Sequence, residues 1–448
     1  MKFTKSGKTL LMIALSAGVI LGLTSCVQSY SVGYLWVTGT NNSASSNNGI
    51  ISGFKIDHNT GRLATINGLP ISSGGANPGR TVLLTGGRFI YVLNRGANAA
   101  GTADCTATDP CNGANVTEFA VGGNGVLSPQ GQQFFSKGIN PTRIIADTSG
   151  NFLYVLDQIA PDPTACALAL GASVTTCGDI TAFKIDSNTG RLTTLLNAQV
   201  TSASGQPLPY FPIPANPIDF VLSSSYILTL SGTPTTGDAV FPYTYSAATG
   251  QLTVNQNSSQ PLNIAQATAI VTAGGDIYVL DNEPGTFTVG QSSTPTTAPG
   301  WIFQFTVGAN GALQQTSGGS VPDDVTLANP NYLILENKGK FLYVLNEGNN
   351  STASNNSTSG IAGYVLDPAT HIPSEISGSP FGTGSGPQCL LEDPSNQFLY
   401  TVNFNDSSVT GRLLDQNSGV LKNLNGSGNK TYTLEGPPAW CITSGRTS

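Results

Sequence analysis

Short apolar stretches recur along the chain in one repeated order, and each ends in a polar or small residue. They are typical of β-strands, whereas no helical period recurs after residue 26. The seven copies are YLWVTG from Tyr34, FIYVLN from Phe89, FLYVLD from Phe152, YILTLS from Tyr226, DIYVLD from Asp276, FLYVLN from Phe341 and FLYTVN from Phe398. A repeat of this kind predicts an architecture in which each copy belongs to one structural unit.

A second signature follows each of these YVLN-type strands: an alternating strand runs into a turn that contains Gly or Asn. The copies are GFKIDHNTGRL from Gly53, EFAVGGNGVL from Glu118, AFKIDSNTGRL from Ala182, PYTYSAATGQL from Pro242, QFTVGANGAL from Gln304, GYVLDPATHI from Gly363 and GRLLDQNSGVL from Gly411. Gly and Asn tolerate the positive φ that tight turns require, so each copy predicts a β-hairpin.

A third signature is a strand entered through a corner of the Asn-Pro type. Its copies are GANPGRTVLL, GINPTRIIAD, PANPIDFVLS, AQATAIVTAG, LANPNYLILE, GSGPQCLLED and EGPPAWCITS. The last copy, at residues 437–444, has no YVLN-type strand after it, and the first YVLN-type strand, at Tyr34, has no corner strand before it. These two incomplete repeats complement each other.

Four strands per repeat predict an all-β fold, a seven-bladed β-propeller in which each blade has four antiparallel strands. We expect the propeller to span residues 34–448 and the N- and C-terminal strands to share one blade, which closes the ring and removes open sheet edges. The alternative, two stacked β-sandwich domains, also has many strands. It does not explain seven copies of one strand order.

The N-terminus has the layout of a secretory signal. Lys2, Lys5 and Lys8 precede an uncharged apolar run at residues 10–21, which is too short for a comfortable transmembrane helix. The run is followed by Leu-Thr-Ser-Cys at residues 23–26, which resembles the bacterial lipobox. The alternative is an ordinary cleaved signal with an incidental cysteine.

By that resemblance, residues 1–25 are a lipoprotein signal peptide, Cys26 is the lipidation site and residues 26–33 are a short tether. We therefore expect an exported protein of the cell envelope that is anchored to a membrane through Cys26. Val27 follows the cysteine instead of the aspartate that commonly marks inner-membrane retention, which favours the outer membrane.

Composition limits the partners. Charged residues are 10% of the chain, against about 25% in typical domains. With 18 Lys plus Arg and a net charge of −7, the chain has no basic stripe, which argues against nucleic acid as a partner. We expect a monomer.

Export permits disulfides. Cys105 and Cys111 close one short loop, Cys166 and Cys177 close another, and both are predicted disulfides. Cys389 and Cys441 are distant in sequence and are either paired or free.

Function is expected at one end of the ring. In an antiparallel blade the start of the corner strand and the end of the YVLN-type strand lie at the same end of the blade. We call this end of the ring the corner face. The opposite end carries the Asn-Thr-Gly turns, and we call it the turn face. Long segments on the corner face are residues 95–116, 158–179, 283–300 and 347–359. Because loops on a rigid frame often carry function, a site is predicted at the channel mouth on this face.

The second residue after each corner proline is predicted to project alike in every innermost strand. These residues are Arg80, Arg143, Asp219, Tyr332, Cys389 and Trp440. Arg80, Arg143, Asp219, Tyr332 and Trp440 are therefore candidates for binding a small anionic or sugar-like ligand. The alternative is that these side chains plug the channel and satisfy one another.

Polar residues at the ends of the YVLN-type strands ring the same mouth: Asn94, Asp157, Asp281, Asn346, Glu347 and Asn403. Asn and Asp commonly cap strand ends and turns, which is the structural alternative for this set.

The corner strand followed by FLYVLNE resembles the seven-bladed lactonase family, which includes bacterial 6-phosphogluconolactonase, and also the YVTN-repeat propellers of surface proteins. Lactonases of this family carry Gly-x-x-Pro-Arg-His before a YVxNE strand. Here Glu347 matches the glutamate, but Asn331 and Tyr332 stand in place of Arg and His. Arg80 and Arg143 take the histidine place in other blades.

Catalytic candidates under that resemblance are Glu347, Arg143 and Asp157, with a carboxylate as general base. The two histidines, His58 and His371, lie at Asn-Thr-Gly-type turns and are interpreted as solvated turn residues.

The chain lacks the serine elbow of hydrolases. It also lacks zinc-type Cys/His spacing and a phosphate loop, and no resident cofactor is predicted. Acidic residues such as Asp157, Asp281 and Glu283 offer oxygen ligands for Ca²⁺, although their order is not that of an EF-hand.

Two functions of different classes remain. The first is an envelope propeller that binds a small molecule or a protein on its corner face, favoured by the absence of histidine from every corner and by the stapled loops. The alternative is a hydrolase of lactones of sugar acids, favoured by the family resemblance and Glu347. A phosphorylated cytosolic lactone would be an unusual substrate for an exported protein.

Overall fold

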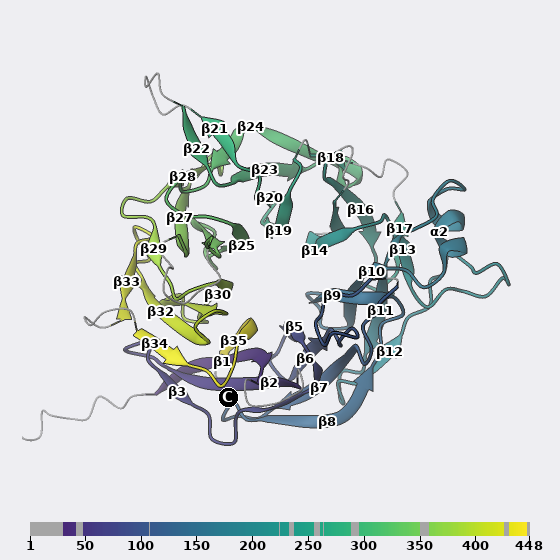
Figure 1. Cartoon of the computed structure of the whole chain (residues 1–448), viewed down its shortest axis with the longest axis horizontal. Coiled ribbons are helices and arrows are strands. Elements are labelled where there is room, and N and C mark those ends of the chain that lie inside the picture. The colour runs from purple at the N-terminus through teal and green to yellow at the C-terminus, as the bar shows by residue number, and fades with distance from the viewer. Residues whose placement is uncertain are drawn as a thin grey trace, which may run out of the picture.

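The computed structural model describes residues 30–41, 48–106, 108–223, 225–232, 237–254, 260–262, 264–287, 295–349, 358–424 and 430–445. The predicted signal peptide and Cys26 lie outside these residues. Seven antiparallel sheets stand around a central channel (Figure 1), which confirms the seven-bladed propeller.

Each blade begins with a corner strand at the channel and continues outward through the YVLN-type strand and the hairpin. Blade 1 contains β35 (Pro438–Gly445), β1 (Ser31–Thr40), β2 (Asn48–Asp57), β3 (Leu63–Thr65) and β4 (Ile71–Ala76). Blade 2 contains β5 (Pro78–Leu83), β6 (Phe89–Asn94), β7 (Asn115–Val121) and β8 (Leu127–Phe134). Blade 3 contains β9 (Ile139–Ala146), β10 (Phe152–Ile159), β11 (Gly178–Ile185), β12 (Leu192–Thr194) and β13 (Phe211–Ile213).

The same order continues around the ring. Blade 4 contains β14 (Pro217–Ser223), β15 (Tyr226–Ser231), β16 (Ala239–Tyr245), β17 (Leu252–Val254) and β18 (Gln260–Pro261). Blade 5 contains β19 (Ala267–Ala273), β20 (Asp276–Asp281), β23 (Trp301–Val307) and β24 (Leu313–Pro322). Blade 6 contains β25 (Pro330–Leu335), β26 (Phe341–Asn346), β27 (Gly360–Leu366), β28 (Pro373–Glu375) and β29 (Phe381–Gly382). Blade 7 contains β30 (Pro387–Glu392), β31 (Phe398–Asn403), β32 (Ser408–Leu414), β33 (Leu421–Asn423) and β34 (Lys430–Thr433).

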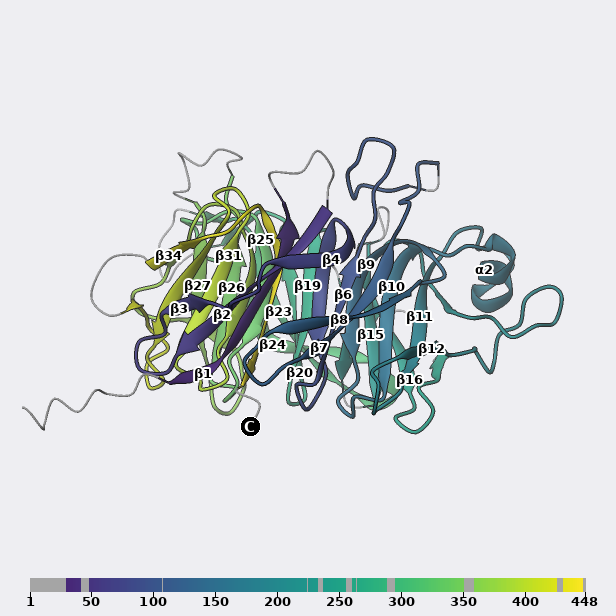
Figure 2. The same ribbon diagram turned by 90° about the horizontal axis from the view of Figure 1, so that it is seen from below.

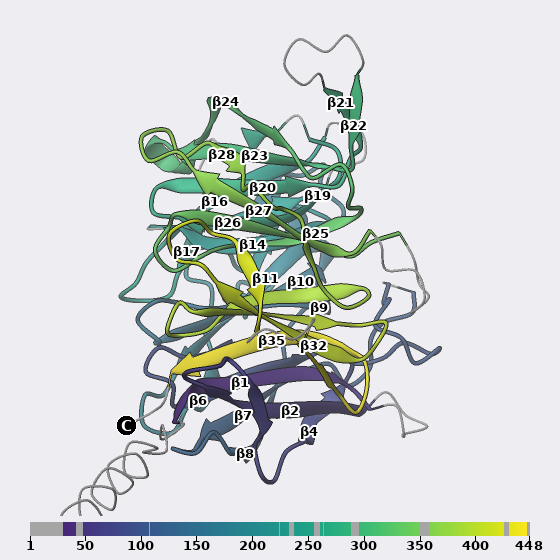
Figure 3. The same ribbon diagram turned by 90° about the vertical axis from the view of Figure 1, so that its left-hand side faces the viewer.

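The two termini close the ring as predicted. β35 is the innermost strand of blade 1 and pairs with β1, with Trp440 opposite Thr38 and Ile442 opposite Trp36. Figure 3 shows the two strands side by side. A disulfide between Cys389 on β30 and Cys441 on β35 also joins blades 7 and 1, and this answers the question that the sequence left open.

A hydrogen bond from the third residue of the YVLN-type strand links neighbouring blades. In six blades this Tyr or Trp donates to a carbonyl of the Asn-Thr-Gly-type turn in the next blade. The pairs are Trp36–Gly125, Tyr91–Gly190, Tyr154–Gly250, Tyr278–His371, Tyr343–Gly419 and Tyr400–Gly61. Blade 4 has Leu228 at this position, so its junction with blade 5 lacks the bond.

Every innermost strand carries a β-bulge just after its corner. On β25, for example, Pro330 pairs with Asn346 and Tyr332 pairs with Leu345, so Asn331 is the extra residue. The same one-residue shift occurs in the other six corner strands. Bulges bend a strand and redirect its side chains, and here they do so at the channel mouth.

Two features differ from the prediction. In five blades the outermost strand is split into two short segments that both pair with the third strand. The segment between β10 and β11 contains a helix, α2 (Pro163–Leu170), capped by Asp162. The helix projects from the rim of the ring (Figures 1 and 2). Two further elements are the hairpin β21 (Gly285–Phe287) with β22 (Thr296–Ala298) and a short 3₁₀ turn at Ala309–Gly311.

Both predicted local disulfides, Cys105–Cys111 and Cys166–Cys177, are present. The second lies in a small apolar cluster with Leu208 and Tyr210. It therefore fastens α2 to the rim of blade 3, away from the channel mouth.

Candidate functional site in the channel mouth

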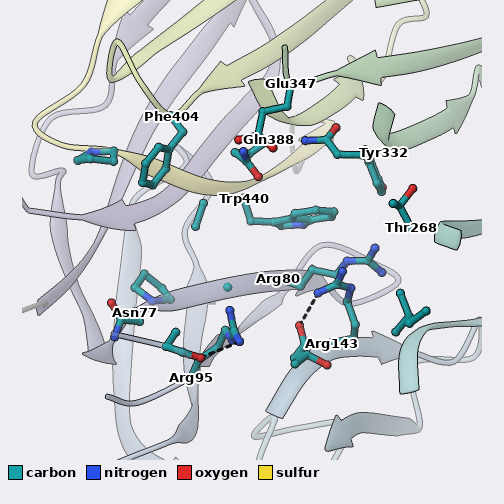
Figure 4. A pocket seen from close by; sticks show the side chains of 18 of the residues that line it. Asn77, Arg80, Arg95, Arg143, Thr268, Tyr332, Glu347, Gln388, Phe404 and Trp440 are labelled. Atoms are coloured by element: carbon teal, nitrogen blue, oxygen red, sulfur yellow. Dashed lines mark hydrogen bonds between the residues drawn. The ribbon is translucent and has the colours of Figure 1, made fainter. Parts of the chain in front are cut away.

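A cavity of about 660 Å³ occupies the channel mouth on the corner face (Figure 4). Its wall uses three positions of the repeat: the two residues after the corner proline and the residue after the YVLN-type strand. The side chains that concern its chemistry are Arg80, Arg95, Arg143, Thr268, Asn331, Tyr332, Glu347, Gln388, Phe404 and Trp440. The bulges explain why both residues after the proline line it, as Asn331 and Tyr332 do.

The corner itself is built by asparagines in a left-handed conformation. Asn77, Asn140, Asn216 and Asn329 have φ between 48° and 58°, which asparagine tolerates better than most residues. The carbonyl oxygen of Asn77 accepts the amide of Arg95, and that of Asn329 accepts the amide of Glu347, at 3.0 and 2.9 Å. The repeated Asn-Pro corner therefore places Arg95 and Glu347 at the mouth.

Arg80 and Asp219 form the floor of the site. The guanidinium nitrogens of Arg80 lie 2.9 and 3.0 Å from the two carboxylate oxygens of Asp219 in a bidentate pair. Asp219 is 1% exposed and also accepts the amide of Phe220 at 2.9 Å. Its acceptor capacity is thus largely used by Arg80 and the backbone.

Arg143 makes only a long contact with the carboxylate that Arg80 holds in a bidentate pair. Its Nε lies 3.5 Å from Asp219 and makes no hydrogen bond, and one Nη donates to the carbonyl of Thr142 at 3.1 Å. Burial and the nearby guanidinium of Arg80 lower the pKa of Arg143 to about 10, which still leaves it charged at neutral pH. Its side chain is 30% exposed and is accessible from the cavity.

Arg95 adds a third positive charge. Its Nη2 donates to the carbonyl of Ala103 and to the side chain of Asn140, at 2.9 and 3.3 Å. Burial lowers its pKa. Three arginines therefore surround the cavity, with Asp219 and Glu347 as the carboxylates nearest to them among the residues that line or floor it.

An aromatic wall faces these charges. The ring of Trp440 packs edge-to-face on Tyr332 with centroids 5.0 Å apart, and the guanidinium carbon of Arg80 lies 4.7 Å from the Trp440 centroid. Phe404, 46% exposed, completes the rim. In Figure 4, Trp440 lies between Arg80 and the pair formed by Glu347 and Gln388.

Glu347 is half-buried and accepts a hydrogen bond from Gln388, and its burial raises its pKa. The cavity therefore holds a carboxyl that protonates more readily than an exposed glutamate, and three arginines line the same cavity. A group of this kind suits proton transfer.

Asp157 does not line the cavity. Its side chain is fully buried in the corner of blade 3, opposite Asp179. Asp281 is 3% exposed and accepts the amides of Gln266 and Glu283, both at 3.2 Å. Asn94, Asn346 and Asn403 are fully buried. Asn94, Asn403 and Asp281 make the hydrogen bonds of capping residues. The geometry does not place Asp157 where a base could reach a ligand in the cavity.

The histidines lie on the turn face. His371 occupies a turn position that is glycine in other blades, with φ 55°, and its Nδ1 lies 2.6 Å from Asp276. Asp276 in turn replaces the phenylalanine that begins most YVLN-type strands. His371 thus serves the junction between blades 5 and 6.

Cys389 and Asp219 were predicted to project like their counterparts, but Cys389 forms the closing disulfide and Asp219 lies below Arg80. Arg95, Thr268, Gln388 and Phe404 were not predicted. The repeat itself carried the signal, because Arg95 and Phe404 occupy the same repeat position as Glu347.

Within the described ranges, His, Cys, Asp and Glu side chains nowhere gather in threes in a way that suits a metal ion. No helix of the described part is long and apolar enough to cross a membrane.

Comparison with known proteins agrees with this geometry. Residues 286–437 match the family model described as "Lactonase, 7-bladed beta-propeller", a segment that includes Tyr332, Glu347 and Gln388. No curated protein matches the sequence significantly.

Three solved structures superpose on nearly the whole chain. A candidate 6-phosphogluconolactonase of Bacteroides fragilis has a TM-score of 0.62 at 16% identity, covering 92% of this chain and 98% of its own. The periplasmic gluconolactonase of Pseudomonas aeruginosa superposes with a TM-score of 0.61 at 16% identity, and the alignment covers 92% of this chain and 99% of that protein. A protein of Lactobacillus plantarum also has a TM-score of 0.61 at 16% identity, and the alignment covers 92% of this chain and 99% of that protein. The chain is therefore a seven-bladed propeller that is similar in sequence to the lactonase family over residues 286–437 and similar in fold to these structures around the whole ring.

Proposed function

We propose that this protein is an envelope-anchored propeller that binds a small carboxylated ligand of the sugar-acid class in the channel mouth on its corner face. The observation that carries the proposal is Arg143. Its side chain is partly exposed to the cavity, and the nearest carboxylate, Asp219, already makes a bidentate pair with Arg80. A ligand carboxylate would pair with the guanidinium of Arg143 from the cavity side, since guanidinium groups favour such pairing.

The rest of the wall suits a polyhydroxylated ring or chain. Trp440 and Tyr332 offer apolar faces, while Thr268, Asn331 and Gln388 offer hydroxyl and amide groups. A few polar groups on a largely apolar concave surface are typical of small-molecule sites. The cavity is of a size that such sites commonly have.

Calorimetric titration with gluconate, glucuronate and their uncharged parent sugars tests this proposal. We expect the acids to bind and the neutral sugars to bind more weakly. Arg143→Gln should weaken binding of the acids by roughly tenfold to hundredfold, because a hydrogen bond to a charged group is lost. Arg191→Gln, an exposed arginine on the turn face, is the matched control. Equal affinity of acids and neutral sugars would contradict the proposal.

Lactone hydrolysis in the same cavity is the second candidate, favoured by the raised pKa of Glu347 and by the three arginines that line the same cavity. Glu347 would take a proton from water as the water oxygen attacks the lactone carbonyl. An arginine would stabilise the resulting oxyanion. The ring C–O bond then breaks, and Glu347 returns its proton to the leaving oxygen to give the hydroxy acid.

This second candidate predicts a pH profile. As a base Glu347 must be ionised, so hydrolysis of gluconolactone above the spontaneous rate should increase as pH rises through a midpoint above that of an ordinary glutamate. Glu347→Gln should remove this component by roughly a hundredfold or more, while leaving gluconate binding measurable. If wild type hydrolyses the lactone no faster than Glu347→Gln does, the hydrolase candidate is wrong and ligand binding is the only one of the two functions left.

A further inference from the structure

We propose that the turn face is the bilayer-facing surface of this protein, so that the channel-mouth site opens away from the membrane. The inference rests on lipidation of Cys26, which is part of the proposed function. It adds an orientation, which follows from where the described chain begins and from how charge is distributed over the two faces.

The described chain begins on the turn face. The carbonyl of Tyr30 accepts the amide of His58 at 3.0 Å, and the two rings stack with centroids 4.4 Å apart and planes 20° apart. Ser31 pairs with Asp57, the last residue of β2 before its turn. Tyr30 is therefore fixed on the turn between β2 and β3.

β1 runs from there to the opposite face. It ends at Thr40, which lines the cavity, and Figure 2 shows β1 rising from the lower face of the ring toward the face with the long loops. Ten strand residues span about 30 Å. The site and the start of the chain thus lie at opposite ends of one strand.

The tether is too short to reverse this arrangement. Cys26 and Tyr30 are four residues apart, and a fully extended chain reaches at most about 14 Å over that distance. A lipid on Cys26 therefore holds the turn of blade 1 close to the bilayer. The mouth of the site stays farther from the bilayer than the tether can reach.

Charge distinguishes the two faces. The loops of the corner face carry Asp104, Asp109, Glu283 and Asp406 near or at the surface, together with the exposed Lys137, while the arginines Arg80, Arg95 and Arg143 line the cavity. Anionic lipids would repel this face.

The turn face offers cations along with its turn aspartates. Exposed basic residues in or beside its turns are Arg62, Arg88, Arg191, Lys338, Lys340 and Lys422. The aspartates of these turns, such as Asp186 and Asp367, accept amides of their own turn. This face approaches an anionic headgroup layer with less repulsion, so the ring should rest on it and not on its corner face.

The test uses the full-length lipidated protein in vesicles of phosphatidylethanolamine and phosphatidylglycerol that contain a headgroup-nitroxide lipid. One fluorophore is attached in each of three variants: Lys338→Cys on the turn face, Thr65→Cys on the rim of blade 1, and Asp104→Cys on the corner face. All three positions are exposed. We expect quenching to be strongest at residue 338, several-fold above that at residue 104.

Stronger quenching at residue 65 would show that the ring lies on its side, and stronger quenching at residue 104 would show that the site faces the bilayer. Either result overturns the inference. If mass spectrometry finds Cys26 without acyl groups, the orientation falls together with the anchor. Ligand binding by the soluble mature protein is then unaffected, so the two failures are distinguishable.

Discussion

Blades 2 and 3 build the same corner with different chemistry. In blade 2, Asn94 at the end of β6 lies directly opposite Asn115 on β7. The amide of Asn94 donates to Asn115, to Thr117 and to the carbonyl of Ser73, at 2.9, 3.0 and 3.1 Å, and the Ser73 hydroxyl donates to Asn94 at 2.6 Å. The side chain of Asn94 is fully buried and fully bonded.

In blade 3 the same four positions hold Ser136, Asp157, Asp179 and Thr181. Asp157 lies directly opposite Asp179, and both are fully buried. The Ser136 hydroxyl donates to Asp157 at 2.8 Å. One oxygen of Asp179 has no hydrogen-bond partner other than the carboxyl of Asp157. Burial raises the pKa of both, that of Asp157 to about 7.

The difference shows that identical backbone geometry does not fix the protonation of a buried pair. Two amides supply donors as well as acceptors, whereas two carboxylates supply acceptors alone. The aspartate pair needs a proton between its members, and this makes the corner of blade 3 sensitive to pH, whereas the amide corner of blade 2 has no titrating side chain.

The largest effect is expected from giving blade 2 the chemistry of blade 3. Asn94→Asp with Asn115→Asp removes the donors that face the Ser73 carbonyl and Thr117. At pH 8 we expect unfolding free energy to fall by about 3 kcal/mol or more, as for other uncompensated buried charges. At pH 5 the loss should be smaller, because a proton can be retained. Urea unfolding at both pH values measures this, and an equal loss at both would contradict the explanation.

The reverse exchange, Asp157→Asn with Asp179→Asn, should reduce the pH dependence of stability. An unfolded aspartate has a pKa of about 3.9, so between that value and about 7 the folded wild type retains protons that the unfolded chain has lost. Its unfolding free energy therefore falls as pH rises through this window.

Burial also raises the pKa of Glu118 and Glu392 to about 7. These two residues therefore also lower the unfolding free energy as pH rises, in wild type and in the double variant alike. The measurement is therefore the loss of unfolding free energy between pH 5 and pH 8, determined by urea unfolding for wild type and for the double variant. We expect this loss to be roughly 1–3 kcal/mol larger in wild type. Parallel pH profiles would show that the pair does not titrate in this range.

The smallest effect concerns the two serines. Ser73→Ala and Ser136→Ala each remove one buried hydrogen bond and should cost about 1 kcal/mol. Because Ser136 donates to a titrating carboxyl, its loss should cost more at pH 8 than at pH 5. Loss of Ser73 should cost the same at both, and thermal melting of the two variants side by side makes the comparison.

Repetition made the ring predictable from sequence. The seven copies of each strand, the two incomplete repeats at the ends and the Asn-Pro corners are local patterns, and the structure confirms the blades and the closure by β1 and β35. A cavity lies on the face where the site was predicted. The helix α2 was missed because eight residues show too little periodicity to stand out.

The interactions inside the site could not be predicted in the same way. Arg80 and Asp219 are separated by 139 positions, and nothing in the repeat says that one corner residue bends across the channel toward another. The pairing of Cys389 with Cys441 could not be predicted for the same reason. Cys389 lies in a complete repeat and Cys441 in an incomplete one, and only the arrangement of neighbouring inner strands brings them together.

Leu228 makes the ring unequal around its circumference. Where the chain ends meet, three ties act together: the pairing of β1 with β35, the Cys389–Cys441 disulfide and the Tyr400 bond to Gly61. Between blades 4 and 5, on the far side of the ring (Figure 1), leucine has no hydroxyl to offer the next turn. Thermal breathing should therefore begin at that seam, and the terminal strands, which fray first in an open sheet, should be among the last to exchange their amide protons.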